Sequence, residues 1–124
     1  MLAASLALAP AVAVSAPQPS AAMAKVDRAI GNTIIETYAD GRTAEIWLAA
    51  SGAYTGEGRR HDMSTGHWSV KGTKLCFTRT HPFAFGLRFC TPIPDVGMGQ
   101  PWQAKAVTGE GITVRVVTGH VVGK

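Results

Sequence analysis

The sequence predicts an all-β protein: a small antiparallel meander barrel or sandwich of about eight short strands, closed by one disulfide. Three observations support this fold class. Runs of β-branched and aromatic residues recur at spacings of about 10 residues, turn-forming residues separate these runs, and two cysteines lie in neighbouring runs. Apart from one helical turn over 24–30, the chain shows no convincing helical pattern.

The first strands follow from side-chain type. Residues 33–38 (TIIETY) are β-branched and aromatic, which favours a strand. Asp40 and Gly41 then predict a two-residue hairpin turn, because both central residues of such a turn need positive φ. The returning strand, 43–50, alternates apolar and other residues, and 53–57 forms a short strand with a glycine bend at its end.

The later strands are separated by polar or flexible connections. A polar connection over 59–64 leads to a strand at 67–71, whose alternation places its tryptophan and valine on one face. The Pro- and Gly-rich stretch 91–100 is expected to be a loop. Strands at 102–107 and 112–118, joined by a Gly-Glu-Gly turn, complete the sheet.

The cysteines test the hairpin formed by 74–80 and 86–91. If Cys76 faces Cys90 across this antiparallel pair, the loop falls at 81–85, where proline and glycine also favour a turn. The absence of a C-x-x-C pair favours a structural disulfide, which fits an oxidising compartment. The same parity places four apolar side chains on the opposite face, as core: Leu75, Phe77, Leu87 and Phe89.

The N-terminal segment 1–24 predicts a signal peptide. It contains no charged side chain and is rich in Ala, Leu and Val, and it is short for a membrane-spanning helix. Ala22-Met23-Ala24 is the preferred cleavage site, with Val14-Ser15-Ala16 as the alternative. We therefore expect a periplasmic or secreted protein that does not span the membrane after cleavage, with a single β domain at 25–124.

The charge distribution argues against nucleic-acid binding. The chain has a net charge of +4, but its Lys and Arg residues are scattered and only Arg59 and Arg60 are adjacent. A nucleic-acid footprint normally needs clustered positive charge. The remaining interpretation of the positive balance is weak attraction to acidic surfaces such as the cell envelope.

Motifs for catalysis or cofactors are not apparent. There is no G-x-S-x-G sequence and no glycine-rich loop before a helix, so we expect a non-enzyme without a cofactor. His61 and His67, with Glu57 and Asp62 nearby, are a weaker alternative as a metal site.

The unusual feature is the aromatic hairpin loop. A hairpin tip is normally polar, yet this one carries Phe83 and Phe85. The two rings either fold back to cap one end of the barrel or form an exposed patch for a ligand, partner or lipid. Together with Trp47 and Arg88 they are the candidate binding residues.

The stretch from Asn32 to Thr91 has a recognisable sequence. It contains NTIIETYADGRT, SGAYTGEG, TGHWSVKGTKLC and FCTP. This stretch resembles small exported β-rich proteins of proteobacteria, a group without a characterised activity, in which a G-x-W strand precedes a C…C hairpin. Gly66-His67-Trp68 is also similar to the G-x-W element of lipocalin-like barrels. The resemblance implies the fold and carries over no functional residues.

These observations favour a non-catalytic exported barrel that binds a small apolar ligand or an envelope component. Small barrels present ligands at their mouths, and the Phe83/Phe85 loop would line one. The alternative is a protein-interaction module, such as an inhibitor of an exported hydrolase that uses the 92–101 loop or the Phe83 loop as a wedge.

Overall fold

The computed structural model describes residues 21–122, so most of the predicted signal peptide lies outside the described residues. Within this range the chain forms one helix and eight strands, which confirms the all-β prediction. The elements are α1 (Ala21–Asp27), β1 (Thr33–Thr37), β2 (Thr43–Leu48), β3 (Ala53–Glu57), β4 (Met63–Lys71), β5 (Lys74–His81), β6 (Arg88–Pro92), β7 (Trp102–Lys105) and β8 (Gly111–Val117).

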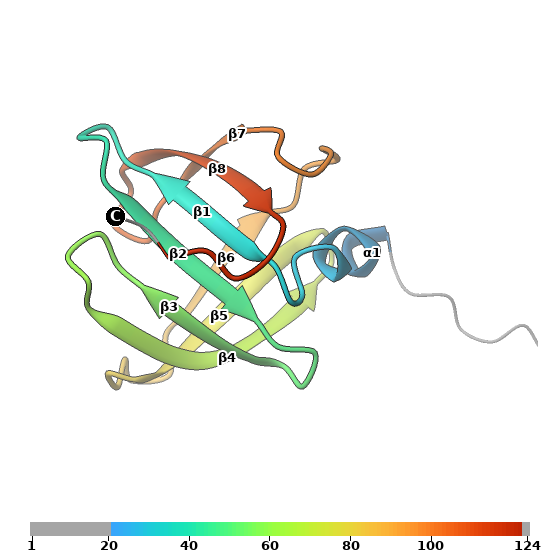
Figure 1. Ribbon diagram of the computed structural model, residues 1–124. Coiled ribbons are helices and arrows are strands. Elements are labelled where there is room, and N and C mark those ends of the chain that lie inside the picture. The colour runs from blue at the N-terminus through green and yellow to red at the C-terminus, as the bar shows by residue number, and fades with distance from the viewer. Residues whose placement is uncertain (1–20, 123–124) are drawn as a thin grey trace, which may run out of the picture.

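The strands form one antiparallel sheet in the order β6-β5-β4-β3-β2-β1-β8-β7. Strands β1 to β6 form a meander, and the β7–β8 hairpin returns to pair with β1. The sheet curls into a nearly closed barrel, with α1 at one end (Figure 1). The edge strands β6 and β7 approach each other without forming a ladder. No helix in the described part is long and apolar enough to cross a membrane.

Helix α1 begins earlier than the predicted helical turn and includes the preferred cleavage site at Ala24. Met23 packs against the core cluster, and Val26 belongs to it. Beyond the helix, the Arg28 guanidinium donates a hydrogen bond to the carbonyl oxygen of Val96 in the loop between β6 and β7. Signal cleavage stays a prediction.

The turn between β1 and β2 differs from the two-residue turn predicted. Thr37 pairs with Thr43, and the Tyr38 N–H donates to the Arg42 carbonyl oxygen at 2.9 Å, so the loop has three residues. Only Gly41 in this loop has positive φ, at 83°. A two-residue type I′ turn would need it at two positions. The register of β1 on β2 is therefore shifted by one residue.

The core lies on the inner face of the barrel and at the end covered by α1. Trp68 is buried there, and its indole Nε1 donates to the Ala49 carbonyl oxygen at 2.8 Å. The prediction that Leu87 belongs to the core is wrong, because β6 begins at Arg88 and leaves Leu87 in the loop, 73% exposed. The buried cluster comprises Val26, Ala29, Ile34, Leu48, Tyr54, Trp68, Leu75, Ala106, Ile112 and Val114.

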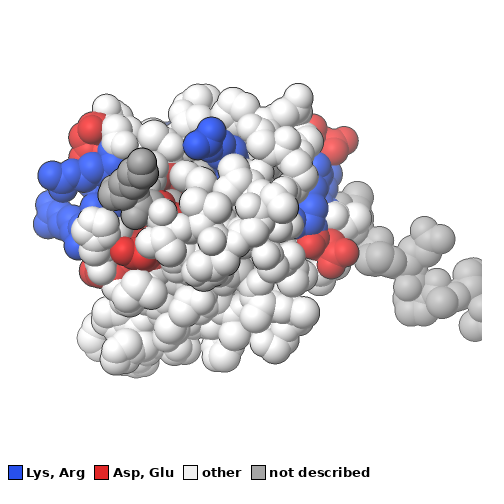
Figure 2. Space-filling view, viewed as in Figure 1, with Lys and Arg blue, Asp and Glu red and all other residues white. Residues whose placement is uncertain are grey.

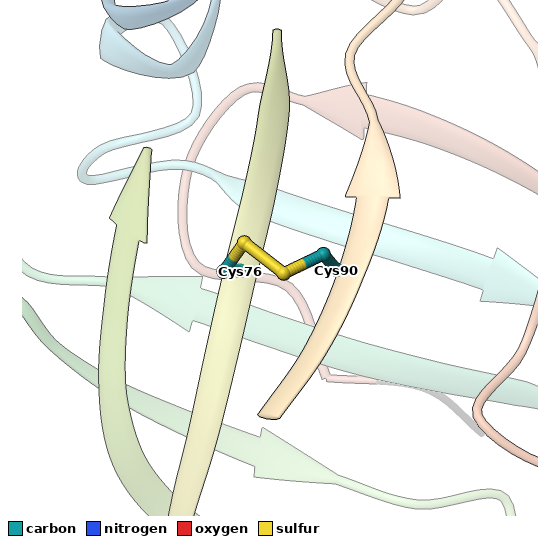
Figure 3. Close-up of a disulfide and its surroundings, with 2 residues drawn as sticks. All are labelled: Cys76 and Cys90. Atoms are coloured by element: carbon teal, nitrogen blue, oxygen red, sulfur yellow. A yellow bond between two sulfur atoms is a disulfide. The ribbon is translucent and has the colours of Figure 1, made fainter. Parts of the chain in front are cut away.

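The disulfide joins β5 to β6, as predicted (Figure 3). Cys76 and Cys90 are direct cross-strand neighbours with a Cα–Cα distance of 4.0 Å. The predicted register holds as far as Thr78, which pairs with Arg88. Cys76 is 1% exposed, so the bridge is shielded on that side. A disulfide is compatible with an oxidising, exported location.

Replacing both cysteines by serine is expected to lower the free energy of unfolding by about 3 kcal/mol. The bridge closes a loop with a sequence separation of 14 residues and restricts the unfolded chain accordingly. Urea unfolding of the oxidised protein and of the Cys76→Ser/Cys90→Ser variant measures the difference. Equal midpoints for the two proteins would contradict the prediction.

Candidate functional site

The inner face of the sheet lines a partly open cavity of about 630 Å³. Its walls are mainly apolar, because alternate residues of each strand point inward and most of these are aliphatic or aromatic. The cavity lies within the volume range of small-molecule pockets. Prominent wall residues are Ile34, Ile46, Phe77, Trp102, Ile112 and Val114.

One end of the cavity is closed and the other is open. At one end lie Val26 and Ala29, which are buried in and just beyond α1. Toward the other end the lining includes Leu87 and Val107, which are both largely exposed. These two residues flank the gap between the start of β6 and the end of β7. The cavity therefore opens to the surface at this corner of the barrel.

Glu36 is the acidic residue in the cavity lining. It lies on β1 between Ala44 of β2 and Val114 of β8, so its strand neighbours supply no charge. Burial among apolar groups disfavours the ionised carboxylate and raises the pKa of Glu36 to about 7. The cavity therefore contains a carboxyl group that changes its charge near neutral pH.

Gly56 and Tyr54 of β3 both contribute to the cavity wall. Gly56 of β3 lies between Ile46 and Ser64 in the ladder, and a Cβ atom there would lie 2.9 Å from the Ser64 hydroxyl. Further along the wall, Tyr54 packs edge-on against Phe77 with ring centroids 5.1 Å apart. Burial raises the pKa of the Tyr54 hydroxyl, so this group stays protonated and can donate a hydrogen bond.

Basic residues outnumber acidic residues around the cavity. Arg79, Arg88 and Lys105 line it near the opening, and Lys25 lines it near α1. The Arg79 Nε donates to the Pro82 carbonyl oxygen at 3.0 Å, which anchors this guanidinium to the β5–β6 loop. The rim of the cavity is therefore positively charged, whereas its walls are apolar.

A charged cluster ties three turns together at the same end of the barrel. The Arg59 guanidinium donates to both carboxylate oxygens of Glu110, at 2.7 and 3.1 Å. It also lies 4.1 Å from the centroid of the Tyr38 ring and 3.7 Å from an Asp40 carboxylate oxygen. The hydrogen bonds from Arg59 lower the pKa of Glu110. These side chains bind one another and so hold the three turns together.

The two predicted phenylalanines do not line the cavity. Phe83 and Phe85 are 69% and 83% exposed, and their ring centroids are 5.0 Å apart. They therefore do not cap the barrel. Ala84 and Arg88, from the same loop and the strand after it, do line the cavity. The structure thus places the exposed rings next to the cavity opening and outside it.

Trp47 lies on the outer face of β2, away from the cavity and the Phe83 loop. Its ring stacks on His120 with centroids 4.3 Å apart, and its Nε1 donates to the Thr33 hydroxyl at 3.1 Å. The Thr33 hydroxyl donates to the Gly119 carbonyl oxygen and accepts the Val121 N–H. The C-terminal segment therefore covers this face, and the ring and the indole N–H of Trp47 both have partners within the protein.

The two histidines proposed as a weaker metal site have different surroundings. His61 Nδ1 lies 2.9 Å from a Glu57 carboxylate oxygen, and His67 is exposed on β4. Residues 21–122 contain no group of three or more His, Cys, Asp or Glu side chains arranged to hold a metal ion.

Sequence reasoning missed Glu36, although a signal was present. Ile34 and Glu36 are two residues apart on one strand and must share a face, so an inward Ile34 requires an inward Glu36. The register with β2 decides which face that is, and it depends on the length of the turn.

Charges on the face seen in Figure 2 are mixed in sign at the two ends of the barrel, and the surface over β3 and β4 is uncharged. That face shows no one-sign patch of the kind that nucleic acids need. Comparison with known proteins gives no match to any family model, curated protein or solved structure.

Proposed function

We propose that this protein is a non-catalytic binding protein of the periplasm or the extracellular medium, with a small apolar ligand in the barrel cavity. The observation that carries the proposal is the cavity of about 630 Å³ inside the sheet. A cavity of this size with apolar walls is suited to an organic ligand.

The lining supports a largely apolar ligand with one hydrogen-bonding group. Ile34, Phe77 and Val114 offer only dispersion contacts and the exclusion of water. Glu36 adds one polar group, and below pH 7 its carboxyl group is mostly protonated and can donate a hydrogen bond. A ligand with an acceptor placed against Glu36 would satisfy this carboxyl group without bringing a charge into the cavity.

Filling the cavity is expected to abolish binding. The probe is N-phenyl-1-naphthylamine, a neutral apolar dye whose fluorescence rises when it leaves water. Ala104 of β7 lines the cavity, whereas its neighbour Gln103 is exposed and hydrogen-bonds to Thr113. Ala104→Phe places a ring inside the barrel, and Gln103→Phe places the same ring outside. We expect dye affinity to fall by about tenfold or more in Ala104→Phe, since its ring competes for the apolar volume, and to stay unchanged in Gln103→Phe.

Equal dye binding by the two variants would show that the dye does not enter the cavity, and no binding by the unmodified protein would overturn the proposal. Native mass spectrometry of the protein from its own cells then identifies the natural ligand. A non-covalent adduct that is lost on denaturation and is weaker in Ala104→Phe is the expected result.

The second candidate is an inhibitor of an exported hydrolase that uses the 92–101 loop or the Phe83 loop as a wedge. The exposure of Phe83 and Phe85 favours it. Inhibition of a periplasmic or secreted hydrolase that is lost in Phe83→Ser/Phe85→Ser and retained in Ala104→Phe would select this function over ligand carriage.

A further inference from the structure

The loop between β5 and β6, residues 82–87, presents apolar side chains to solvent; we call it the aromatic tip. Phe83, Phe85 and Leu87 are 69%, 83% and 73% exposed. Burying one such side chain is favourable by about 1.5–3 kcal/mol, so leaving three of them in water forgoes considerable stability. Clustered exposure of this kind marks a surface that is covered when the protein works.

Backbone conformation holds one of these rings outward. Phe85 has φ 55°, in the left-handed region that bulky residues rarely adopt. The Leu87 N–H donates to the Ala84 carbonyl oxygen at 3.0 Å and fixes the turn around Phe85. Backbone strain at a residue whose ring stays exposed is evidence that the exposed position of the ring serves a function.

The segment of the chain that carries the aromatic tip has charges of one sign. Residues 63–94 contain no Asp or Glu, and their four cationic residues include Arg79 and Arg88, which flank the tip. In the described part of the chain neither arginine forms an ion pair with a carboxylate. The Arg79 Nε is held by the Pro82 carbonyl oxygen, but no carboxylate of residues 21–122 neutralises either guanidinium, so both can meet negative charge presented beside the tip.

We propose that the aromatic tip docks on the surface of an anionic phospholipid bilayer. The rings of Phe83 and Phe85 would enter the apolar boundary below the headgroups, while Arg79 and Arg88 meet the phosphates. A lipid surface fits better than a protein, because a specific protein interface needs roughly 800 Å² on each partner, and six residues of a hairpin loop offer little area. A bilayer needs no complementary shape.

Docking in this way places the cavity opening at the bilayer. Leu87 and Arg88 belong to the tip or follow it directly, and both line the cavity. A ligand that leaves the membrane would therefore reach the barrel without crossing open water. The docking proposal itself does not depend on an occupied cavity, because the tip is exposed and charged as described in the ligand-free protein.

The test is partition of the full chain, without added ligand, onto vesicles of phosphatidylcholine with and without phosphatidylglycerol. Phe83→Ser/Phe85→Ser removes the rings, and Met98→Ser/Val122→Ser removes two exposed apolar side chains elsewhere. All variants carry the same N-terminal segment, so any affinity of that segment for lipid cancels. We expect the phenylalanine variant to partition about tenfold or more weakly than the control, with an unchanged urea midpoint.

The electrostatic part has its own variant. Arg88→Gln is expected to weaken partition onto the phosphatidylglycerol vesicles by about fivefold and to leave partition onto pure phosphatidylcholine unchanged. Equal partition of the phenylalanine variant and its control would overturn the proposal. Self-association that is lost with the phenylalanines, in a protein that does not bind vesicles, would overturn it in favour of a second copy. Ala104→Phe is expected to bind vesicles like the unmodified protein, because its aromatic tip is unchanged. Vesicle binding by a protein that does not bind the dye would therefore reject the cavity proposal and leave the docking proposal standing.

Discussion

Replacing Glu36 by glutamine should raise the free energy of unfolding at pH 8 by about 3 kcal/mol. The cause is the burial that raises the pKa of Glu36 from 4.5 to about 7. In the unfolded chain the carboxyl group ionises near pH 4.5, whereas in the folded protein it holds its proton until about pH 7. Between these values the folded protein binds more protons, so its stability falls as the pH rises. Above pH 7 the loss is complete.

The measurement is the urea midpoint of both proteins from pH 4 to pH 8. Glu36→Gln should remove most of the decline seen in the unmodified protein between pH 4.5 and 7, and the two proteins should agree at pH 4. Asp95→Asn is the matched control, since it makes a similar acid-to-amide change at a carboxylate that is 87% exposed. A Glu36→Gln profile parallel to that of the unmodified protein would refute a buried, protonated Glu36.

Replacing Gly66 by alanine is expected to destabilise the protein by more than about 4 kcal/mol. A Cβ atom at Gly66 would collide with the Thr78 carbonyl oxygen and lie 2.9 Å from the Arg79 Cα and 2.8 Å from the Tyr54 ring. Two of these neighbours are backbone atoms of β5, which comes close here because a bulge shifts its register at Gly66. Backbone in the middle of a ladder cannot move without breaking hydrogen bonds.

Two other glycines calibrate this prediction. Gly111→Ala should be nearly neutral, because nothing lies within 4 Å of its new Cβ. Gly56→Ala should lie between the two, since its Cβ would meet the Ser64 hydroxyl, which can rotate. Urea midpoints should therefore rank Gly111→Ala, Gly56→Ala and Gly66→Ala from most to least stable. If Gly66→Ala does not fold, the soluble yield of the three variants should follow the same order, and a stable Gly66→Ala would contradict the close approach.

The strands were predictable because they depend on local signals. Short β-branched runs and turn residues located all eight strands, and the two cysteines fixed the register of β5 on β6. The G-x-W element also has a local reason in the structure: Gly66 gives room to β5, and Trp68, two residues later, enters the core.

The candidate site was less predictable because it depends on register and on distant contacts. A two-residue turn after β1 would pair Glu36 with Glu45, on the outer face, whereas the three-residue turn pairs it with Ala44 and turns it inward. Trp47 was a candidate binding residue in the sequence, but in the structure the C-terminal segment covers it. The stacking contact joins Trp47 to His120 across 73 residues, and no local sequence pattern reveals it.

The unjoined edges of the sheet have a consequence for solubility. Strands β6 and β7 are the two ends of the strand order, so each leaves backbone N–H and C=O groups without a partner strand. Such edges are templates for pairing with another chain. Here Pro92 removes an N–H donor from β6, the charged Lys105 ends β7, and Cys90 ties β6 to its neighbour. Pro92 protects the edge of β6 only in part, and reduction of the disulfide frees this edge. The reduced protein is therefore the form from which strand-exchanged aggregates would grow.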